Sequence, residues 1–392
     1  MKIVIAPQAF KGSLTAPEAT EAIARGVRQV FGRADLVLLP VADGGEGTVR
    51  ALVRARGGTL VTARVQGPLG EPVNALWGLI GNGAEAVIEM AEASGITLIR
   101  RDERNPLRTS TLGTGELIRD ALNAGVRKIL IGVGGSATND GGMGMAVALG
   151  VRFLDSSGTP LKPSGAALER IDRIDITGMD ARIRDVEVVA AVDVTNPLCG
   201  PEGASAVYGP QKGATADMVR RLDEGLAHYA AVIRSDLGVD VADISGAGAA
   251  GGLAAGLVAF LGAQLRPGVE VVFRAIDIET RLRGAAFVIT GEGRMDRQDI
   301  YGKAPLAVAK HARNLGIPTI AIVGSTGRDY RIVFDHGIDA VIGIVNRPMP
   351  LDRALSESHR LLTEAAMRAC RMIRVGMRVE RNRKQDYNSV QE

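Results

Sequence analysis

The chain has 392 residues, with 47 Lys and Arg against 44 Asp and Glu, and its net charge of +3 and aromatic content of 3% argue against nucleic acid as a partner. The two cysteines, Cys199 and Cys370, argue against a disulfide scaffold, and no apolar run approaches the ~20 residues that would cross a membrane. We therefore expect a cytoplasmic globular protein of two or three domains that contacts no membrane.

Two strand–loop–helix units open the chain. Residues 2–7 form a β-branched apolar run that ends at a turn, and Thr15 then begins a helical pattern with an acid in its first turn. A second apolar run at 35–42 is followed by the loop DGGEG and by another helical pattern, which ends at Gly57. This order predicts two β-loop-α units in succession.

The middle of the chain has a different pattern. Residues 58–91 alternate with a period of two and contain Gly-rich turns, which predicts a meander of short strands. A helix is expected at 114–126, then the buried strand KILIGV, a further strand at 186–193 and a long helix at 215–237. We expect these elements to form a second α/β domain.

The C-terminal third returns to regular alternation of strand and helix, and three more parallel strands are expected there. The simplest α/β architecture puts the first two strands and the last three in one parallel, doubly wound sheet. We expect this domain to comprise residues 1–64 and 285–376, with 65–284 inserted as the second α/β domain and the active site in the cleft between them. Residues 377–392 lack an apolar period and are expected to be a disordered tail.

Glycine accounts for 50 residues, and these gather in short runs beside Asp, Ser, Thr and Asn, as in backbone that approaches a phosphorylated ligand. The longest run, GGSATNDGGMGM at 134–145, follows a buried strand directly, which favours phosphate binding over a plain turn. The candidate nucleotide-binding residues are Gly134, Gly135, Ser136, Thr138, Asn139, Asp140 and Gly141.

Two further loops could hold an anion or a substrate. FKGSL at 10–14 places Lys11, Gly12 and Ser13 between a strand end and a helix start, although a plain loop with a solvated lysine has the same pattern. PVADGGEGT at 40–48 places Asp43, Gly44 and Gly45 at the end of a buried strand, where open α/β sheets bind ligands. A sharp turn with a capping Asp remains the alternative there.

Four acidic residues stand out in the sequence. Asp193 ends a strand, so it could be a general base, a metal ligand or only a turn former. Glu292 and Asp296 flank Arg294 in a Gly-rich loop, and two such carboxylates beside phosphates suit Mg²⁺. Glu89 lies inside an apolar strand and therefore needs a partner.

GAGAAGG at 246–252 formally matches the dinucleotide pattern G-x-G-x-x-G, with Glu270 near the distance of a ribose-binding acid. The preceding residues, DVADIS, are a poor strand, so close packing of a helix explains the small residues better. A nicotinamide-dependent dehydrogenase stays open as an alternative enzyme class.

The chain resembles the glycerate kinase family of ATP-dependent kinases through an ordered set of motifs: FKGSL, PVADGGEGT, TLGTGELI, GGSATNDGGMG, DVTNPLCGPEGA, GAGAAGGL and GEGRMDRQ followed by GKAP. Each motif alone is modest, but the ordered set is specific and spans residues 1–374. The resemblance implies transfer of the γ-phosphoryl group of ATP to a hydroxyl of D-glycerate with Mg²⁺, and it favours 2-phosphoglycerate as product. The partners are then small molecules, and a homo-oligomer stays open.

On this hypothesis Lys11 and the amides around Gly12 and Ser13 hold the transferring phosphate or the glycerate carboxylate, and Asp193 is the base or orienting group at the acceptor hydroxyl. Loop 134–145 cradles the ATP phosphates, and Asp43, Gly44 and Gly45 bind substrate. Glu292 and Asp296 help to hold Mg²⁺ or orient the substrate.

The chain departs from the family at one sensitive place. Gln8 and Ala9 precede FKGSL where the family has Asp-Ser, so a carboxylate and a hydroxyl are missing. A smaller departure is Asp299, where the family tends to have Ser. Two alternatives follow: a kinase of another small hydroxy acid, and a non-catalytic ligand-binding relative.

Overall fold

The structure is a computed structural model that describes residues 1–297 and 303–389. The chain forms two compact units: Met1–Ala42 with Ile276–Glu392, and Asp43–Ala275. Both boundaries differ from the expected positions after residues 64 and 284. The reason is that strand Thr59–Gln66 pairs within the middle sheet, while helix Ile278–Leu282 packs on a helix of the terminal unit.

The first unit contains a five-stranded sheet in the order β13-β12-β11-β1-β2, and every adjacent pair is parallel. Its strands are β1 Lys2–Pro7, β2 Asp35–Leu38, β11 Ala285–Met295, β12 Thr319–Thr326 and β13 Ala340–Gly343. This confirms the predicted parallel sheet of two N-terminal and three C-terminal strands. Interior strand β1, which lies between β11 and β2, is apolar and buried beyond Lys2, as expected of a parallel strand covered on both faces.

Helices cover this sheet. They are α1 Ala16–Arg28, α10 Ile278–Leu282, α11 Ala304–Asn314, α12 Leu351–Ser356 and α13 Ser358–Ser389, with a 3₁₀ segment at Tyr330–His336. Helix α1 begins with a capping box, in which Thr15 Oγ1 accepts the Glu18 N–H and Glu18 accepts the Thr15 N–H. It packs against α13, and both helices contribute to one apolar core with β1.

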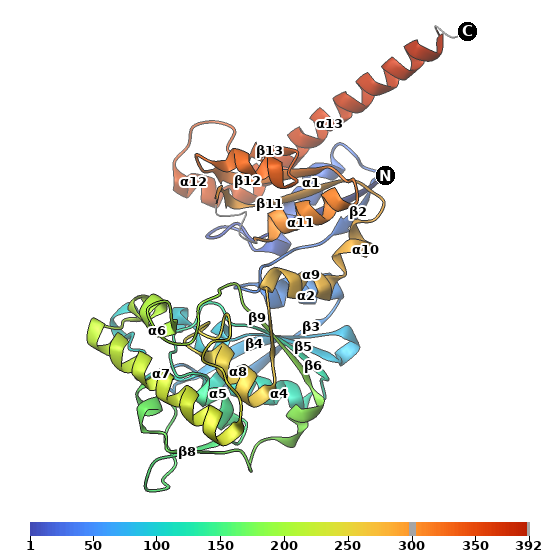
Figure 1. Cartoon of the computed structure of the whole chain (residues 1–392). Coiled ribbons are helices and arrows are strands. Elements are labelled where there is room, and N and C mark those ends of the chain that lie inside the picture. The colour runs from blue at the N-terminus through green and yellow to red at the C-terminus, as the bar shows by residue number, and fades with distance from the viewer. Residues whose placement is uncertain (298–302, 390–392) are drawn as a thin grey trace. The chain divides into compact units, whose positions relative to one another are not determined.

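Helix α13 continues through Ser389, where we expected a disordered tail from residue 377. Residues 374–383 are all exposed, so this part of the helix adds nothing to the core. Figure 1 shows it projecting from the first unit.

The second unit contains a six-stranded sheet in the order β10-β9-β6-β5-β4-β3. Strands β3, β4 and β5 are antiparallel to their neighbours among these three, as the period of two predicts. The pairs β5–β6, β6–β9 and β9–β10 are parallel. The strands are β3 Thr59–Gln66, β4 Pro72–Ile80, β5 Glu85–Glu89, β6 Lys128–Gly132, β9 Glu187–Ala191 and β10 Gln264–Arg266, with a separate ribbon of β7 Arg152–Leu154 and β8 Arg173–Asp175.

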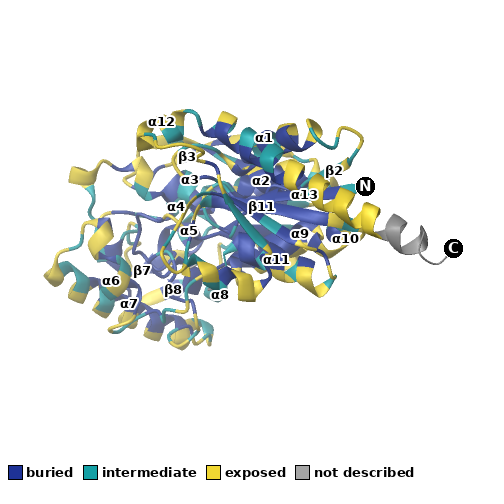
Figure 2. Ribbon diagram, turned by 90° about the horizontal axis from the view of Figure 1, so that it is seen from above, coloured by how far each residue is buried: buried dark blue, intermediate teal, exposed yellow. Residues whose placement is uncertain are grey.

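The helices of this unit are α2 Thr48–Arg56, α3 Ala91–Ser94, α4 Leu112–Asn123, α5 Met143–Ala148, α6 Ala204–Tyr208, α7 Ala216–Leu237, α8 Leu253–Leu261 and α9 Gly268–Ile276. Short 3₁₀ segments lie at Gly81–Gly83, Ile96–Leu98, Arg101–Glu103, Gly165–Arg170, Ala181–Asp185 and Pro210–Lys212. Figure 2 shows buried strands and helices whose outer faces are exposed. Within the described residues, no helix has the length and apolar character needed to cross a bilayer.

Candidate functional site

The loop of residues 43–47 passes over the carboxyl ends of β6 and β9. A Cβ added at Gly44, whose φ is +90°, would lie 2.9 Å from both the Ala191 Cβ and the Gly268 Cα. A Cβ added at Gly132, the last residue of β6, would lie 2.4 Å from the Gly44 carbonyl oxygen. Glycine is therefore required wherever this loop crosses the strand ends.

Asp193 lies beside this loop, two residues beyond the end of β9. Its Oδ1 accepts the backbone N–H of Gly268 at 2.8 Å, and its Oδ2 would be 3.7 Å from a Cβ added at Gly44. Partial burial of the carboxylate raises the pKa of Asp193 to about 6, although the residue as a whole is exposed. The Asp43 carboxylate also raises this pKa, while the Gly268 N–H lowers it.

A carboxylate with a pKa near 6 is largely ionised at neutral pH and more basic than an ordinary aspartate. It can therefore accept a proton from a hydroxyl group positioned against it. Asp43 and Gly44, two of the residues expected to bind substrate, lie beside Asp193, and Gly45 follows in the same loop. Gly268, which holds Asp193, carried no sequence signal, because its contact joins residues 75 positions apart.

The loop after β6 contains two different parts. Gly134 and Gly135 are exposed, and a Cβ added at Gly134 would lie 3.5 Å from the Gly45 Cα, so this end adjoins the 43–47 loop. Ser136 is 8% exposed, whereas Thr138, Asn139 and Asp140 are wholly buried. Asn139 Nδ2 donates to the Ser205 hydroxyl at 3.0 Å, so this side chain supports the loop from within the unit.

Asp140 organises this support. Its Oδ2 accepts the backbone N–H groups of Thr111 and Gly144 and the Thr111 hydroxyl at 2.8–3.1 Å, and its Oδ1 accepts the Gly142 N–H at 3.2 Å. Burial raises the pKa of Asp140 despite these four hydrogen bonds. Sequence reasoning placed this residue at the ligand and missed Thr111, since nothing local distinguishes a loop's ligand contact from its internal hydrogen bonds.

Lys212 is a second buried residue that supports this loop, and it was not among the residues expected to bind the ligand. The residue is 2% exposed, and its Nζ donates to the Thr138 carbonyl oxygen at 2.7 Å. Burial lowers the pKa of Lys212 to about 7, and the Asp140 charge partly opposes that shift. The Gly/Pro-rich surroundings of Lys212 were the only sequence signal.

The small residues at 246–252 pack against the same loop. A Cβ at Gly251 would lie 2.0 Å from the Thr138 carbonyl oxygen, and Gly141 N–H donates to the Gly251 carbonyl at 3.0 Å. In the described structure no strand leads directly into this run, because the element before it is helix α7. The run therefore lacks the strand–turn–helix context of a dinucleotide site. The run is explained by close packing before α8.

In the first unit, Lys11, Gly12 and Ser13 form the turn that follows β1. Lys11 and Gly12 are exposed, and the Ser13 hydroxyl donates to the Phe10 carbonyl at 3.1 Å. A Cβ at Gly293 of β11 would lie 3.4 Å from the Lys11 amide nitrogen, so this turn borders the end of β11.

The two expected metal ligands also lie at the end of β11. Glu292 is 6% exposed with its Oε2 3.6 Å from Lys303 Nζ, and Asp296 Oδ2 is 3.4 Å from Arg294 Nε. No group of three metal-ligating side chains occurs among the described residues. These carboxylates could therefore supply single oxygens to a cation held mainly by phosphate, but they do not build a complete metal site.

The two departures noted in the sequence differ in what can be said of them. Gln8 is 8% exposed, and its backbone N–H donates to the Gly291 carbonyl at 2.8 Å, which places it beside β11. Asp299 lies outside the described residues.

Comparison with known proteins gives a consistent result. The model of the Glycerate kinase family matches residues 3–374. The chain is 53% identical over 364 residues to a glycerate kinase of Halalkalibacterium halodurans, covering 93% of this chain and 96% of the relative. It is 48% identical over 378 residues to the glycerate 2-kinase of Escherichia coli, covering 96% and 99%.

A crystal structure from Salmonella typhimurium, provisionally assigned as a glycerate kinase 2, superposes with a TM-score of 0.88 at 48% identity and covers 96% of this chain and 99% of that one. The likeness extends through both units.

The raised pKa of Asp193 predicts a stability change. Because the folded-state pKa of about 6 exceeds the ordinary 3.8, ionised Asp193 destabilises the fold above pH 6, and this penalty disappears as the pH falls toward 4. Asp193→Asn should therefore melt at a higher temperature than the parent at pH 7.5, with the difference vanishing near pH 4. Thermal unfolding followed by circular dichroism measures both.

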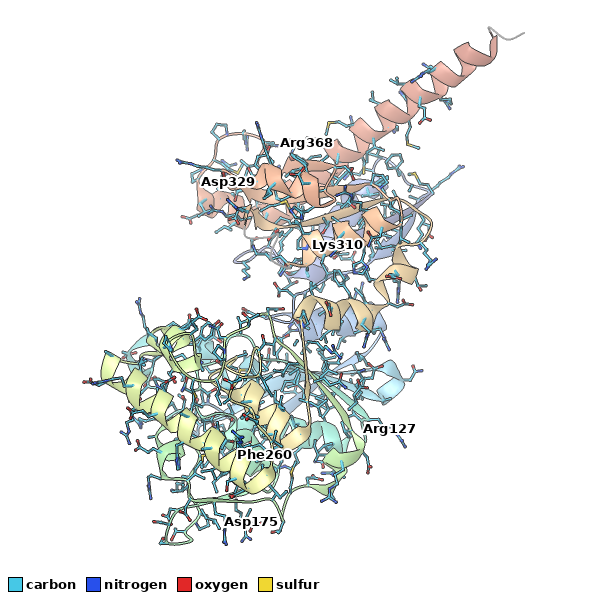
Figure 3. All side chains as sticks on the ribbon, viewed as in Figure 1. Arg127, Asp175, Phe260, Lys310, Asp329 and Arg368 are labelled. Atoms are coloured by element: carbon cyan, nitrogen blue, oxygen red, sulfur yellow. The ribbon has the colours of Figure 1, made fainter. Side chains whose placement is uncertain are left out.

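The matched control is Asp329→Asn at an exposed carboxylate of the first unit, labelled in Figure 3, which should show no such pH-dependent difference. Equal melting temperatures of Asp193→Asn and parent across the pH range would contradict a raised pKa of Asp193.

Proposed function

Because the chain belongs to the glycerate kinase family, we propose that it transfers the γ-phosphoryl group of ATP to a hydroxyl of D-glycerate, forming phosphoglycerate and ADP. The arrangement that carries the proposal is the partly buried Asp193 carboxylate, held by the Gly268 N–H beside the glycine backbone of the 43–47 loop. Phosphoryl transfer needs mainly positioning and charge neutralisation, and a base at the acceptor hydroxyl completes those requirements.

We propose O2 of glycerate as the acceptor, giving 2-phosphoglycerate. The support is the name of the Escherichia coli relative, a glycerate 2-kinase, with 48% identity over nearly the whole of both chains. A kinase that phosphorylates O3 or another small hydroxy acid is the alternative, because the residues described do not distinguish neighbouring hydroxyls.

In the proposed mechanism, Asp193 accepts the proton of the acceptor hydroxyl as its oxygen attacks the γ-phosphorus and the bond to the ADP oxygen breaks. Asp43, Gly44 and Gly45 orient the substrate through loop backbone and the Asp43 carboxylate. Lys11, with the amides of Gly12 and Ser13, binds the transferring phosphate or the glycerate carboxylate. Exposure of Lys11 and Gly12 is consistent with contact to a ligand.

For the nucleotide we propose that Gly134 and Gly135 contact the phosphates through their exposed backbone. Ser136, Thr138, Asn139, Asp140 and Gly141 hold that backbone in shape, since most of their polar atoms lie inside the unit. The nucleotide-binding role of the loop is thereby divided between two exposed glycines and their buried support.

We propose that Mg²⁺ accompanies ATP and is held mainly by its phosphates, with Glu292 or Asp296 supplying an oxygen. A bound Mg²⁺ would neutralise charge between the β- and γ-phosphates. Glu292 pairs with Lys303 and Asp296 pairs with Arg294, and these ion pairs orient the two carboxylates.

A non-catalytic ligand-binding protein is the second candidate, because Gln8 and Ala9 stand where the family has Asp-Ser. Gln8 is nearly buried beside β11, so the exchange leaves a neutral side chain close to the Lys11 turn.

The first test is release of ADP from Mg²⁺-ATP in the presence of D-glycerate, with the product offered directly to enolase. We expect ADP release and consumption of the product by enolase, because enolase takes 2-phosphoglycerate. Release without consumption indicates the 3-phosphate, and binding of glycerate without ADP release favours the non-catalytic candidate.

The role of Asp193 predicts a pH limb and a loss of turnover. The kcat/KM of the parent should fall as the pH drops through about 6, where Asp193 becomes protonated. Asp193→Asn should lower kcat by about 10²-fold to 10⁴-fold, as loss of a general base does. Steady-state rates between pH 5 and 8 measure both, and a near-normal kcat in the variant rules out the base.

The role of Lys11 predicts a severe loss on removal of its charge. Lys11→Met should lower kcat/KM by about 10²-fold or more, the usual cost of deleting a group that stabilises transferring charge. Lys310→Met, at an exposed lysine of α11 labelled in Figure 3, is the matched control and should leave kcat/KM unchanged. Equal kinetics of the two variants would reject the assignment.

A further inference from the structure

Helix α2 begins without a capping side chain of its own. Its N-cap residue is Gly47, with φ +89°, so no N-cap side chain accepts a backbone N–H of the first turn, although the Thr48 N–H donates to the Gly45 carbonyl at 3.2 Å. The acceptor comes from β5 instead: Glu89 Oε1 accepts the Val49 N–H at 2.7 Å and Oε2 accepts the Gly47 N–H at 3.1 Å. This is the partner that an acid in an apolar strand requires.

A carboxylate at this position is costly. Glu89 is 5% exposed, and burial raises its pKa to about 7 despite the two amide donors. The charged groups that face it are the carboxylates of Glu92 and Glu46, and both raise the pKa further. Neutral side chains would fill the same space more cheaply, so the charge itself requires an explanation. Two charge-assisted hydrogen bonds at a helix N-terminus provide it.

The two bonds act on the 43–47 loop as well as on the helix. At one end of this loop, Gly44 fits closely against Ala191 and Gly268. At the other end, the Thr48 hydroxyl donates to the Gly45 carbonyl at 2.7 Å, and the Glu89 carboxylate fixes Gly47. Glu89 is therefore the anchor of the loop at its helical end.

We propose that Glu89 is a positioning residue. By accepting the N–H groups of Gly47 and Val49, its carboxylate holds the 43–47 loop in the conformation that binds the acceptor substrate. The inference rests on the proposed function in one respect, that this loop contacts the acceptor. Glu89 acts through the loop backbone, since the hydrogen bonds described above join it to Gly47 and Val49 and not to Asp43 or Asp193.

Protonation of Glu89 weakens the anchor, because a neutral carboxyl has only one good acceptor oxygen for two N–H donors. Since the pKa is raised to about 7, the anchor is complete above pH 7 and is lost as the pH falls below it. Because the titrations of Glu89 and Asp193 overlap, the Glu89→Gln variant, which retains Asp193, separates the two effects.

The opposite end of the same strand and helix supplies a control. Glu85 Oε1 accepts from Arg56 Nη2 at 3.1 Å at the last turn of α2, and Arg56 also donates to the Ala275 carbonyl oxygen. Glu85→Gln removes a charge from the same strand, at a residue that pairs with the same helix, far from the loop.

The experiment measures hydrogen exchange of the Gly47 and Val49 amides and the KM for D-glycerate in the full chain. Glu89→Gln should speed exchange of both amides and raise KM by about tenfold or more, with a smaller effect on kcat, since misplaced binding groups weaken positioning. Glu85→Gln should change neither. In the parent, KM should rise between pH 8 and pH 6.5, and Glu89→Gln should lose this dependence.

Unchanged exchange in Glu89→Gln overturns the anchor, and faster exchange with an unchanged KM overturns its role in substrate positioning. If Glu89→Gln does not fold, the parent decides the matter: protection of the two amides, corrected for intrinsic exchange, must fall below pH 7. Failure of the proposed function is distinguishable, because the parent would then release no ADP with D-glycerate whatever the exchange shows.

Discussion

Close approach of one backbone segment to two strand ends is the constraint on which the candidate site depends. Gly44 can lie against Ala191 and Gly268 only because none of the crossing positions Gly44, Gly132 and Gly268 carries a side chain. That approach brings the Asp43 and Asp193 carboxylates near enough to influence each other, and it helps keep Asp193 partly desolvated. The chemistry of the site thus follows from a steric condition on main-chain atoms.

The polar groups behind the site serve the same end. Asp140 and Lys212 are buried, and each is bonded chiefly to backbone atoms of the glycine-rich loop or its neighbours. Burying such groups is unfavourable unless they are hydrogen-bonded, so they select one loop conformation strongly. Glu89 does this for the 43–47 loop. The glycine-rich backbone of the candidate site is thus held in place by hydrogen bonds from buried polar side chains.

Local patterns were sufficient for part of this arrangement. The apolar runs at Lys2–Pro7 and in the C-terminal third predicted the parallel sheet, because buried parallel strands have a continuous apolar sequence. The strand-end position of Asp193 was also readable. The partition between the two units was readable only in part: residues 58–91 were expected in the middle domain, but no local pattern showed that helix Thr48–Arg56 packs on β4 and β5. Gly268 and Thr111 escaped notice because their contacts depend on strand order. The burial of Asp140 inside its loop was not readable either, because burial is a tertiary property.

The discontinuous first unit has a consequence for biosynthesis. Strand β1 lies between β2 and β11 in the sheet, yet β11 begins at Ala285, nearly three hundred residues after β1 leaves the ribosome. At ~5–20 residues per second, translation of that interval lasts tens of seconds. The middle unit, continuous from Asp43 to Ala275, is complete before β11 emerges. The nascent chain therefore carries β1 without its β11 partner until the middle unit has been synthesised, and the sheet of the first unit can be completed only after that.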